Sequence, residues 1–332
     1  MHNQTKEESQ PNHDQSLSVY KTISLTIQFL EALIGILING FMVAVNLIDL
    51  RVQGHLGSCD SILTCLGISR FCLQFMMLTL YILSYFFSTY ATSDSVTNGF
   101  TYSYLFFNNT CLWFATWLCT FYCVRIVSSQ QRLFVTIKTH FDRLVPALLV
   151  SALVISYLST ALFSSNKSMF GNWSFNSHGS KNNTDPFAFS GTDLVIWSSL
   201  CILGSTPPFV IFCTTAWLVI HSLLKHTRKM KSQERTGFRE PSLKAHYGAI
   251  KTMFHFFLFY LLYMVAINIR MSGTLKDDSW TGCFCAVVLG AYPSIHSGFL
   301  VNGNSKLRQS FIRLLHKGNC YLQTSKTEIP EM

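Results

Sequence analysis

The sequence predicts an all-α membrane protein, a seven-transmembrane helix bundle followed by a short amphipathic helix. Three observations support this prediction. Of the 332 residues, 49% are hydrophobic and only 12% are charged, about half the charged share of a typical soluble domain. The apolar residues form seven long blocks, and Lys and Arg gather in alternate segments between these blocks. A soluble chain of this length would need far more charged surface.

Each of the seven blocks is long enough to cross a bilayer as a helix, which takes about 20 mostly apolar residues. A helix also satisfies its own backbone hydrogen bonds, which lipid cannot do. The second and third blocks are the least uniform, because the second contains Arg70 and the third contains Asn108 and Asn109. The predicted spans are about 22–48, 61–87, 102–127, 144–164, 193–224, 249–272 and 282–302.

These spans divide the chain into three parts. Residues 1–21 are polar and are expected to form an extracellular N-terminus, and the first block is too long for a cleaved signal sequence, so we expect a retained anchor. Residues 22–302 form the seven-transmembrane domain. Residues 303–332 form a cytoplasmic tail, in which Lys306–His316 carries Leu and Phe on one face at helical spacing. That stretch is typical of a short helix on the inner membrane surface.

The basic residues predict the orientation. In a chain with seven spans, the first, third and fifth connecting segments and the tail share one side of the membrane, and they hold most of the Lys and Arg. Basic residues favour the cytoplasmic side. We therefore expect a plasma-membrane protein with its N-terminus outside and its C-terminus in the cytoplasm. The same distribution accounts for the net charge of +9 without a nucleic-acid partner.

Glycosylation sequons mark the predicted outer face. Three Asn-x-Ser/Thr sequences begin in the segment 165–192, at Asn166, Asn172 and Asn182. N-glycosylation takes place on the lumenal side only. Their position agrees with an extracellular N-terminus and predicts a glycoprotein.

Polar side chains inside the apolar spans usually have a partner or a function. An arginine near a helix centre costs about 2.5–3.5 kcal/mol on insertion, so we expect Arg70 to face the bundle interior. There it would meet Asn39 of the first span and Ser297 of the seventh in an intramembrane polar clamp. Extension of the arginine to the inner interface is the alternative. Glu31, nearer the outer end of the first span than Asn39, could pair with a cation, be protonated or contact a ligand.

The sequence gives no support for a metal, a cofactor or an enzyme. The 11 cysteines lack zinc-binding spacing, and there is neither an HExxH helix nor a GxSxG nucleophile elbow. The two halves of the chain also lack the paired broken helices of an inverted-repeat transporter. A membrane transporter remains an alternative function, and it would show substrate flux across the membrane.

Six strings, in chain order, extend through about residues 30–308. They are Gly35–Phe41 (GILINGF), Asp60–Arg70 (DSILTCLGISR), Trp113–Ile126 (WFATWLCTFYCVRI), Ser222–Met230 (SLLKHTRKM), Arg239–His246 (REPSLKAH), and Tyr292–Ser297 (YPSIHS) with Asn304–Leu307 (NSKL). Together they resemble the type 2 taste receptors, the bitter taste branch of the G-protein-coupled receptors. The chain departs from the family patterns at Ile38, Arg125 and Glu240, where Gly, Lys and Asp are usual. Vomeronasal type 1 receptors are the nearest receptor alternative.

The resemblance implies a cavity among the helices that opens to the outside and binds small bitter organic agonists. It implies that the ligand-binding residues are Tyr104, Asn108, Cys111, Tyr263 and Ala286. Helical spacing puts the first three on one face of the third span. For Asn108 an interhelical hydrogen bond is the alternative, and glycosylation of its Asn-Asn-Thr sequon would exclude it from the cavity.

At the inner face, the resemblance implies coupling to a gustducin-type heterotrimeric G protein. Arg125, His226 and Lys229 are the residues expected to face it. A basic inner face also favours anionic membrane lipid, which is the alternative role for these charges.

Overall fold

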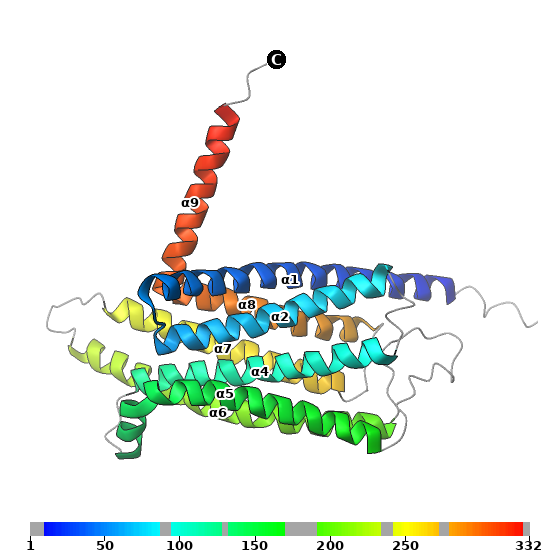
Figure 1. Cartoon of the computed structure of the whole chain (residues 1–332), viewed down its shortest axis with the longest axis horizontal. Coiled ribbons are helices and arrows are strands. Elements are labelled where there is room, and N and C mark those ends of the chain that lie inside the picture. The colour runs from blue at the N-terminus through cyan, green and yellow to red at the C-terminus, as the bar shows by residue number, and fades with distance from the viewer. Residues whose placement is uncertain are drawn as a thin grey trace, which may run out of the picture.

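The computed structural model describes residues 10–86, 94–127, 132–169, 191–233, 242–271 and 279–327, and every regular element in these ranges is an α-helix (Figure 1). In chain order the helices are α1 (Gln10–Gln53), α2 (Ser58–Phe86), α4 (Asp94–Ile126), α5 (Arg132–Met169), α6 (Gly191–Gln233), α7 (Ser242–Met271), α8 (Trp280–Gly303) and α9 (Ser305–Thr327). The predicted all-α fold class is confirmed.

The helices α1 to α8 run alternately back and forth and form one bundle (Figure 1). Packing closes the bundle into a ring, because α1 contacts both α2 and α8, α2 contacts α4, α4 contacts α6, and α7 joins α6 to α8. Helix α5 packs on the outside of α4 with smaller contacts to α2 and α6. The start of α1 and the whole of α9 lie at opposite ends of the bundle, as an odd number of passes requires (Figure 1).

The exterior of the bundle is apolar. Leu37, Tyr157 and Trp217 are each more than 60% exposed, a pattern that suits hydrocarbon and not water. Among the described residues, five helical segments are long and apolar enough to cross a membrane, and α7 adds the shorter apolar stretch Phe254–Ile269. The five are Thr22–Gln53, Ser58–Leu83, Thr139–Ser165, Gly204–Lys225 and Trp280–Gly303. The chain is therefore a multi-pass membrane protein.

Helix α4 is not among these five segments, and its position in the bundle explains why. It packs against α2, α5 and α6, and the six consecutive residues from Cys111 to Thr116 are all buried, whichever way they point. A helix covered by protein on all sides presents little surface to lipid, so its polar residues can meet partners in neighbouring helices. The polar third span of the sequence is thus the central helix of the bundle.

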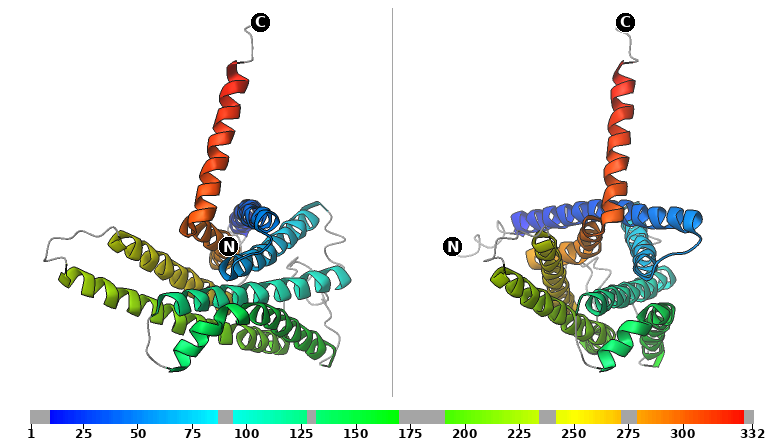
Figure 2. Two further views of the ribbon diagram at one scale, coloured as in Figure 1. Left: turned by 60° about the vertical axis from the view of Figure 1, so that its left-hand side comes forward. Right: turned by 90° about the vertical axis from the view of Figure 1, so that its left-hand side faces the viewer.

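Helix α9 leaves the bundle crosswise at the end of α8 (Figures 1 and 2). Asn304 separates the two helices, and its Oδ1 accepts hydrogen bonds from the backbone N–H groups of Lys306 and Leu307 at 3.0 and 3.3 Å, which caps the start of α9. Leu307 is fully buried. Phe311 packs edge-to-face on Phe41 of α1, with ring centroids 5.6 Å apart. These contacts attach the first turns of α9 to the bundle.

Candidate functional site

Arg70 of α2 lies in the bundle with its side chain fully buried. Its Nη1 donates to Ser297 Oγ of α8 at 2.9 Å, and Ser297 Oγ donates in turn to Asn39 Oδ1 of α1 at 2.7 Å. The second terminal nitrogen, Nη2, bonds to Nδ1 of His296. The structure therefore brings together the three residues expected to form a polar clamp, and the guanidinium points inward instead of reaching the inner interface.

His296 is a member of this cluster that sequence reasoning missed. A guanidinium can only donate hydrogen bonds, so the Nδ1 atom bonded to Arg70 must be the acceptor. The imidazole is then neutral and carries its hydrogen on Nε2. The ring packs edge-to-face on Phe256 of α7, with centroids 4.3 Å apart. His296 thus joins α7 to the arginine, although its string in the sequence gave no indication of which way the ring points.

Three tyrosines form an aromatic cluster beside Arg70. The Tyr292 ring of α8 lies 5.9 Å from the guanidinium carbon of Arg70, within cation–π range. On α7, the rings of Tyr263 and Tyr260 lie 4.8 and 5.9 Å from that of Tyr292. Phe212 of α6 packs edge-to-face on Tyr260 at 4.7 Å. The cluster of Tyr260, Tyr263 and Tyr292 therefore couples α6, α7 and α8 to the buried arginine on α2.

Asn108 of α4 is bonded directly to this tyrosine cluster. The Tyr263 hydroxyl donates to Asn108 Oδ1 at 2.8 Å, and both side chains are buried. One turn further along α4, the Cys111 thiol donates to Ser69 Oγ of α2 at 3.3 Å. Two of the residues that the resemblance implies are thus in contact, and a third reaches the helix that carries Arg70. The buried amide of Asn108 leaves no room for a glycan.

The other two implied residues are less enclosed. Tyr104 and Ala286 are half-buried, and they lie in the halves of α4 and α8 nearest the start of α1 (Figure 1). A narrow cavity lies further along α4, and none of the five implied residues lines it. Its lining residues are Ala115, Leu118, Cys119, Tyr122, Phe212, Phe256 and His296.

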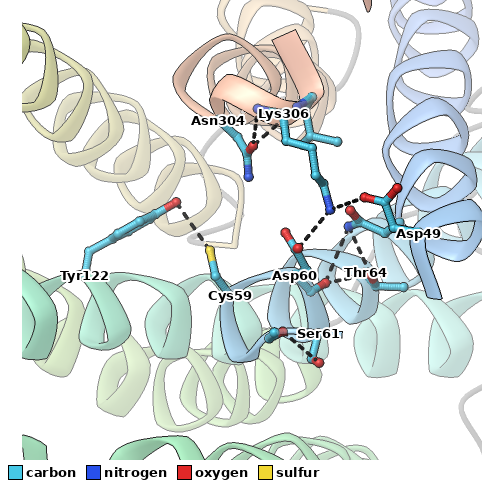
Figure 3. Close-up of polar contacts among 11 residues, drawn as sticks. Asp49, Cys59, Asp60, Ser61, Thr64, Tyr122, Asn304 and Lys306 are labelled. Atoms are coloured by element: carbon cyan, nitrogen blue, oxygen red, sulfur yellow. Dashed lines mark hydrogen bonds and ion pairs between the residues drawn. The ribbon is translucent and has the colours of Figure 1, made fainter. Parts of the chain in front are cut away.

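At the opposite end of the bundle, Lys306 of α9 bridges α1 and α2 (Figure 3). Its Nζ lies 2.8 Å from Oδ2 of Asp49 and 2.8 Å from Oδ2 of Asp60. Partial burial acts to lower the pKa of Lys306, but hydrogen bonds to the two carboxylates outweigh it, and the pKa is raised. Sequence reasoning did not assign this contact, although Asp60 and Lys306 belong to strings that carry the resemblance.

Arg125 ends α4 at the same end of the bundle. Its Nη2 donates to both carboxylate oxygens of Asp142 in α5, at 3.1 and 2.9 Å, and Ser58 of α2 donates to the same carboxylate at 2.7 Å. Both charged side chains are more than half exposed. Such exposed pairs contribute about 0–1 kcal/mol, so this contact is easily broken.

Several predicted residues cannot be placed in this way. The side chains of Asn166 on α5 and of His226 and Lys229 on α6 lie outside the described part of the structure, and so do Asn172 and Asn182 altogether. Their assignment to glycosylation and to G-protein contact stays a prediction.

Six helices in a closed ring around a hydrogen-bonded arginine, with α5 packed outside, make the described part of the chain a multi-pass membrane helix bundle. The family model described as "Taste receptor protein (TAS2R)" matches residues 17–319, and the chain belongs to this family of type 2 taste receptors. The resemblance drawn from the six strings is confirmed.

Individual relatives agree with the family model. The chain is 31% identical to taste receptor type 2 member 40 of Gallus gallus over 312 residues, which cover 91% of this chain and 97% of the relative. It is 33% identical to member 39 of Homo sapiens, covering 88% and 86%, and 36% identical to member 119 of Mus musculus, covering 86% and 82%. The protein is therefore a chemoreceptor of the bitter-taste class of G-protein-coupled receptors, and the family is one of receptors and not of enzymes.

Replacing Arg70 by Ala should destabilise the receptor. Ser297 and His296 would lose a buried hydrogen-bond partner, which costs about 1–3 kcal/mol. We expect a lower melting temperature of the purified protein and less receptor at the cell surface. The control is Arg51→Ala, which removes an exposed arginine at the end of α1 and should change neither quantity. An unchanged melting temperature in Arg70→Ala would contradict the clamp.

Replacing Lys306 by Met should loosen α9 in a pH-dependent way. A group whose pKa is raised in the folded state stabilises that state fully below its unfolded pKa, and this contribution is lost as the pH rises through the folded pKa. The melting temperature of the variant should be lower than that of the wild type at neutral pH, and the difference should vanish above the raised pKa of Lys306. The exposed Arg308 of α9, replaced by Met, is the matched control. A difference that does not depend on pH would contradict the ionic contact.

Proposed function

We propose that the receptor binds small bitter organic agonists between α4, α7 and α8 and activates a gustducin-type heterotrimeric G protein. The proposed agonist-contacting residues are Tyr104, Asn108, Cys111, Tyr263 and Ala286. The protein would lie in the plasma membrane with residues 1–21 outside, the domain 22–302 in the bilayer and the tail 303–332 in the cytoplasm. Family membership supports the general class of ligand and of signalling partner.

The observation that carries the proposal is the hydrogen bond from Tyr263 to Asn108. In this arrangement Asn108 is 8% and Tyr263 is 1% exposed, so the two side chains occupy the space that an agonist would need. A ligand with a carbonyl or hydroxyl group could replace either partner, because an amide both donates and accepts. Such a ligand binds only where α4 and α7 have separated, and it therefore shifts the population toward that arrangement.

The tyrosine cluster supports a route from this site to the centre of the bundle. When Tyr263 leaves Asn108, its contact with Tyr292 must change as well, since the two rings pack at 4.8 Å. Tyr292 lies in turn against Arg70, which is bonded to α8. Densely packed interiors move between discrete arrangements and do not deform continuously. Agonist binding would thus be coupled to a displacement of α7 relative to α2 and α8.

At the inner face, the proposal assigns Arg125, His226 and Lys229 to the G-protein contact. Arg125 is held by Asp142 through an exposed ion pair, which we take to be the resting arrangement. The weak pairing allows a G protein to replace Asp142 as the partner of Arg125 at small cost.

Membrane lipid is the remaining proposed partner. Helix α9 is crosswise to the bundle (Figure 1), with Leu314 and Leu315 exposed beyond its docked first turns. Arg308 and Arg313 lie on the same helix and give it positive charge. An amphipathic helix of this kind lies in the interface of an anionic leaflet.

Replacing Asn108 by Ala should weaken agonist responses. In cells that express the receptor with a promiscuous G protein, the calcium response to agonists from a bitter-compound panel should shift to higher concentrations by about tenfold, which corresponds to about 1.4 kcal/mol. Surface labelling should show normal expression. Thr110→Ala removes the same sequon without removing Asn108, and it should leave the dose response unchanged. If the dose response of Asn108→Ala equals that of the wild type, Asn108 does not contact the agonist.

Replacing Asp142 by Asn should raise basal signalling. The variant releases Arg125 from its resting partner, and loss of an exposed ion pair worth up to about 1 kcal/mol changes an equilibrium by up to about fivefold. Nucleotide exchange on the G protein, measured without agonist, tests this expectation. Ser58→Ala keeps the ion pair and removes only the hydroxyl hydrogen bond to Asp142, so its effect should be smaller. Basal exchange that falls in Asp142→Asn would be inconsistent with a resting contact.

A further inference from the structure

Glu31 of α1 is a half-buried acid that the mechanism above does not use, and one of its carboxylate oxygens is fully buried. It lies within the apolar segment Thr22–Gln53, and its Oε2 is buried with no hydrogen-bond donor in reach among the described residues. An ionisable group at this depth is costly, and it normally has a partner. Glu31 therefore needs a positively charged or proton-donating partner that the described part of the protein does not supply.

Of the cations that the structure describes on or against α1 and α2, Arg51 lies in the last turn of α1, far along the helix from Glu31, and the other two are held by other groups. Arg70 is bonded to Ser297 and His296. Lys306 lies at the inner end, between Asp49 and Asp60 (Figure 3). Neither can serve Glu31 without breaking a contact that holds three helices together.

The seam between α1 and α8 has space for the carboxylate. A Cβ atom added at Gly290 of α8 would lie 2.6 Å from Glu31 Oε2, which is far too close, so only a glycine lets the carboxylate rest against α8 here. Ser294, one turn further along α8, donates to the backbone carbonyl of Glu31 at 2.9 Å. Ala286, one of the proposed agonist-contacting residues, lies one turn before Gly290 on α8.

Polar side chains continue from Glu31 toward the outer end of α1. Gln28 Nε2 donates to Ser24 Oγ at 2.9 Å, and the Tyr81 hydroxyl of α2 donates to Gln28 Oε1 at 2.7 Å. These groups place polar atoms beside Glu31 on α1 and α2, toward the end of the bundle where α1 begins. Polar atoms near a carboxylate favour a charged group over an apolar one at this place.

We propose that Glu31 is an acidic subsite that binds the ammonium group of a basic agonist at the seam of α1, α2 and α8. This inference rests on the proposed function and names the chemical class of one group of ligands, protonated amines. The uncharged part of the same ligand would reach toward Ala286 and the Asn108–Tyr263 contact. In surroundings of low dielectric constant, the attraction between ammonium and carboxylate is much stronger than in water.

The test compares charged and uncharged agonists in the variant Glu31→Gln, which keeps the size of the side chain and removes its charge. Each amine agonist found in the bitter panel is paired with an analogue in which carbon or oxygen replaces the basic nitrogen. For the amines, the half-maximal concentration should rise about tenfold or more in Glu31→Gln, and for the analogues it should change by less than about twofold. Equal shifts in both groups, no shift in either, or a panel without active amines would overturn the proposal.

A second variant tests the same site through its geometry. Gly290→Ala should displace the carboxylate and weaken the amine responses selectively. Gly298→Ala is the matched control on the same helix, because a Cβ atom there meets nothing within 4 Å, and its responses should equal those of the wild type. If Gly290→Ala leaves the amine responses unchanged, the seam does not hold the ligand.

Binding can also be measured without signalling. The melting temperature of the purified receptor should rise with added n-hexylammonium but not with 1-hexanol, and Glu31→Gln should abolish the rise, because a ligand that binds the folded state stabilises it. If the wild-type receptor gives no response to any agonist in cells but its melting temperature rises with n-hexylammonium, only the proposed function is contradicted. A receptor that responds to uncharged agonists but shows no rise with n-hexylammonium would contradict only the acidic subsite.

Discussion

Burying an arginine in a membrane protein is the constraint on which most of this structure depends. The guanidinium of Arg70 must be surrounded by acceptors, because each unpaired donor in hydrocarbon would be costly. Ser297 and His296 of α8 supply acceptors for the two terminal nitrogens, whereas Nε has no acceptor among the described residues, and Ser297 donates in turn to Asn39 of α1. The first, second and seventh passes of the chain are therefore joined at mid-membrane. Tyr292 of α8 packs against Arg70, and the tyrosines of α7 pack against Tyr292, so α7 is connected to the same joint.

Much of this arrangement follows from the sequence because polar residues are rare in apolar spans. Arg70 needed partners, and Asn39 and Ser297 were among few candidates at the right depth. The contact of Tyr263 with Asn108 could not be derived in that way, since the direction of each side chain depends on how α4 and α7 rotate about their axes. The pairing of Arg125 with Asp142 was also missed. Charges near helix ends form an interface to water and lipid in which many partners are possible, and the tertiary structure selects one.

The half of the bundle nearest the start of α1 combines two kinds of surface. Toward α4 and α7 it offers aromatic rings and one amide, which suit uncharged, partly apolar molecules. Toward α1 and α2 it offers glutamine, serine and tyrosine hydroxyl groups that lead to Glu31. Helix α8 lies between the two, with Ala286 and Gly290 as small residues on successive turns. Small side chains on the helix that separates the two surfaces let one ligand contact both.

The central position of α4 has a consequence for how the chain is made. During synthesis, segments leave the translocation channel sideways into lipid according to their own apolarity. The helix with the fewest lipid contacts in the finished bundle is then the one least suited to leave alone. Ser69 of α2 accepts a hydrogen bond from the Cys111 thiol of α4. Thr116 of α4 donates a hydrogen bond to the backbone carbonyl of Pro208 in α6. The first of these partners precedes α4 in the chain and the second follows it, so until α6 has been synthesised α2 is the one of these two helices that can offer α4 a polar contact.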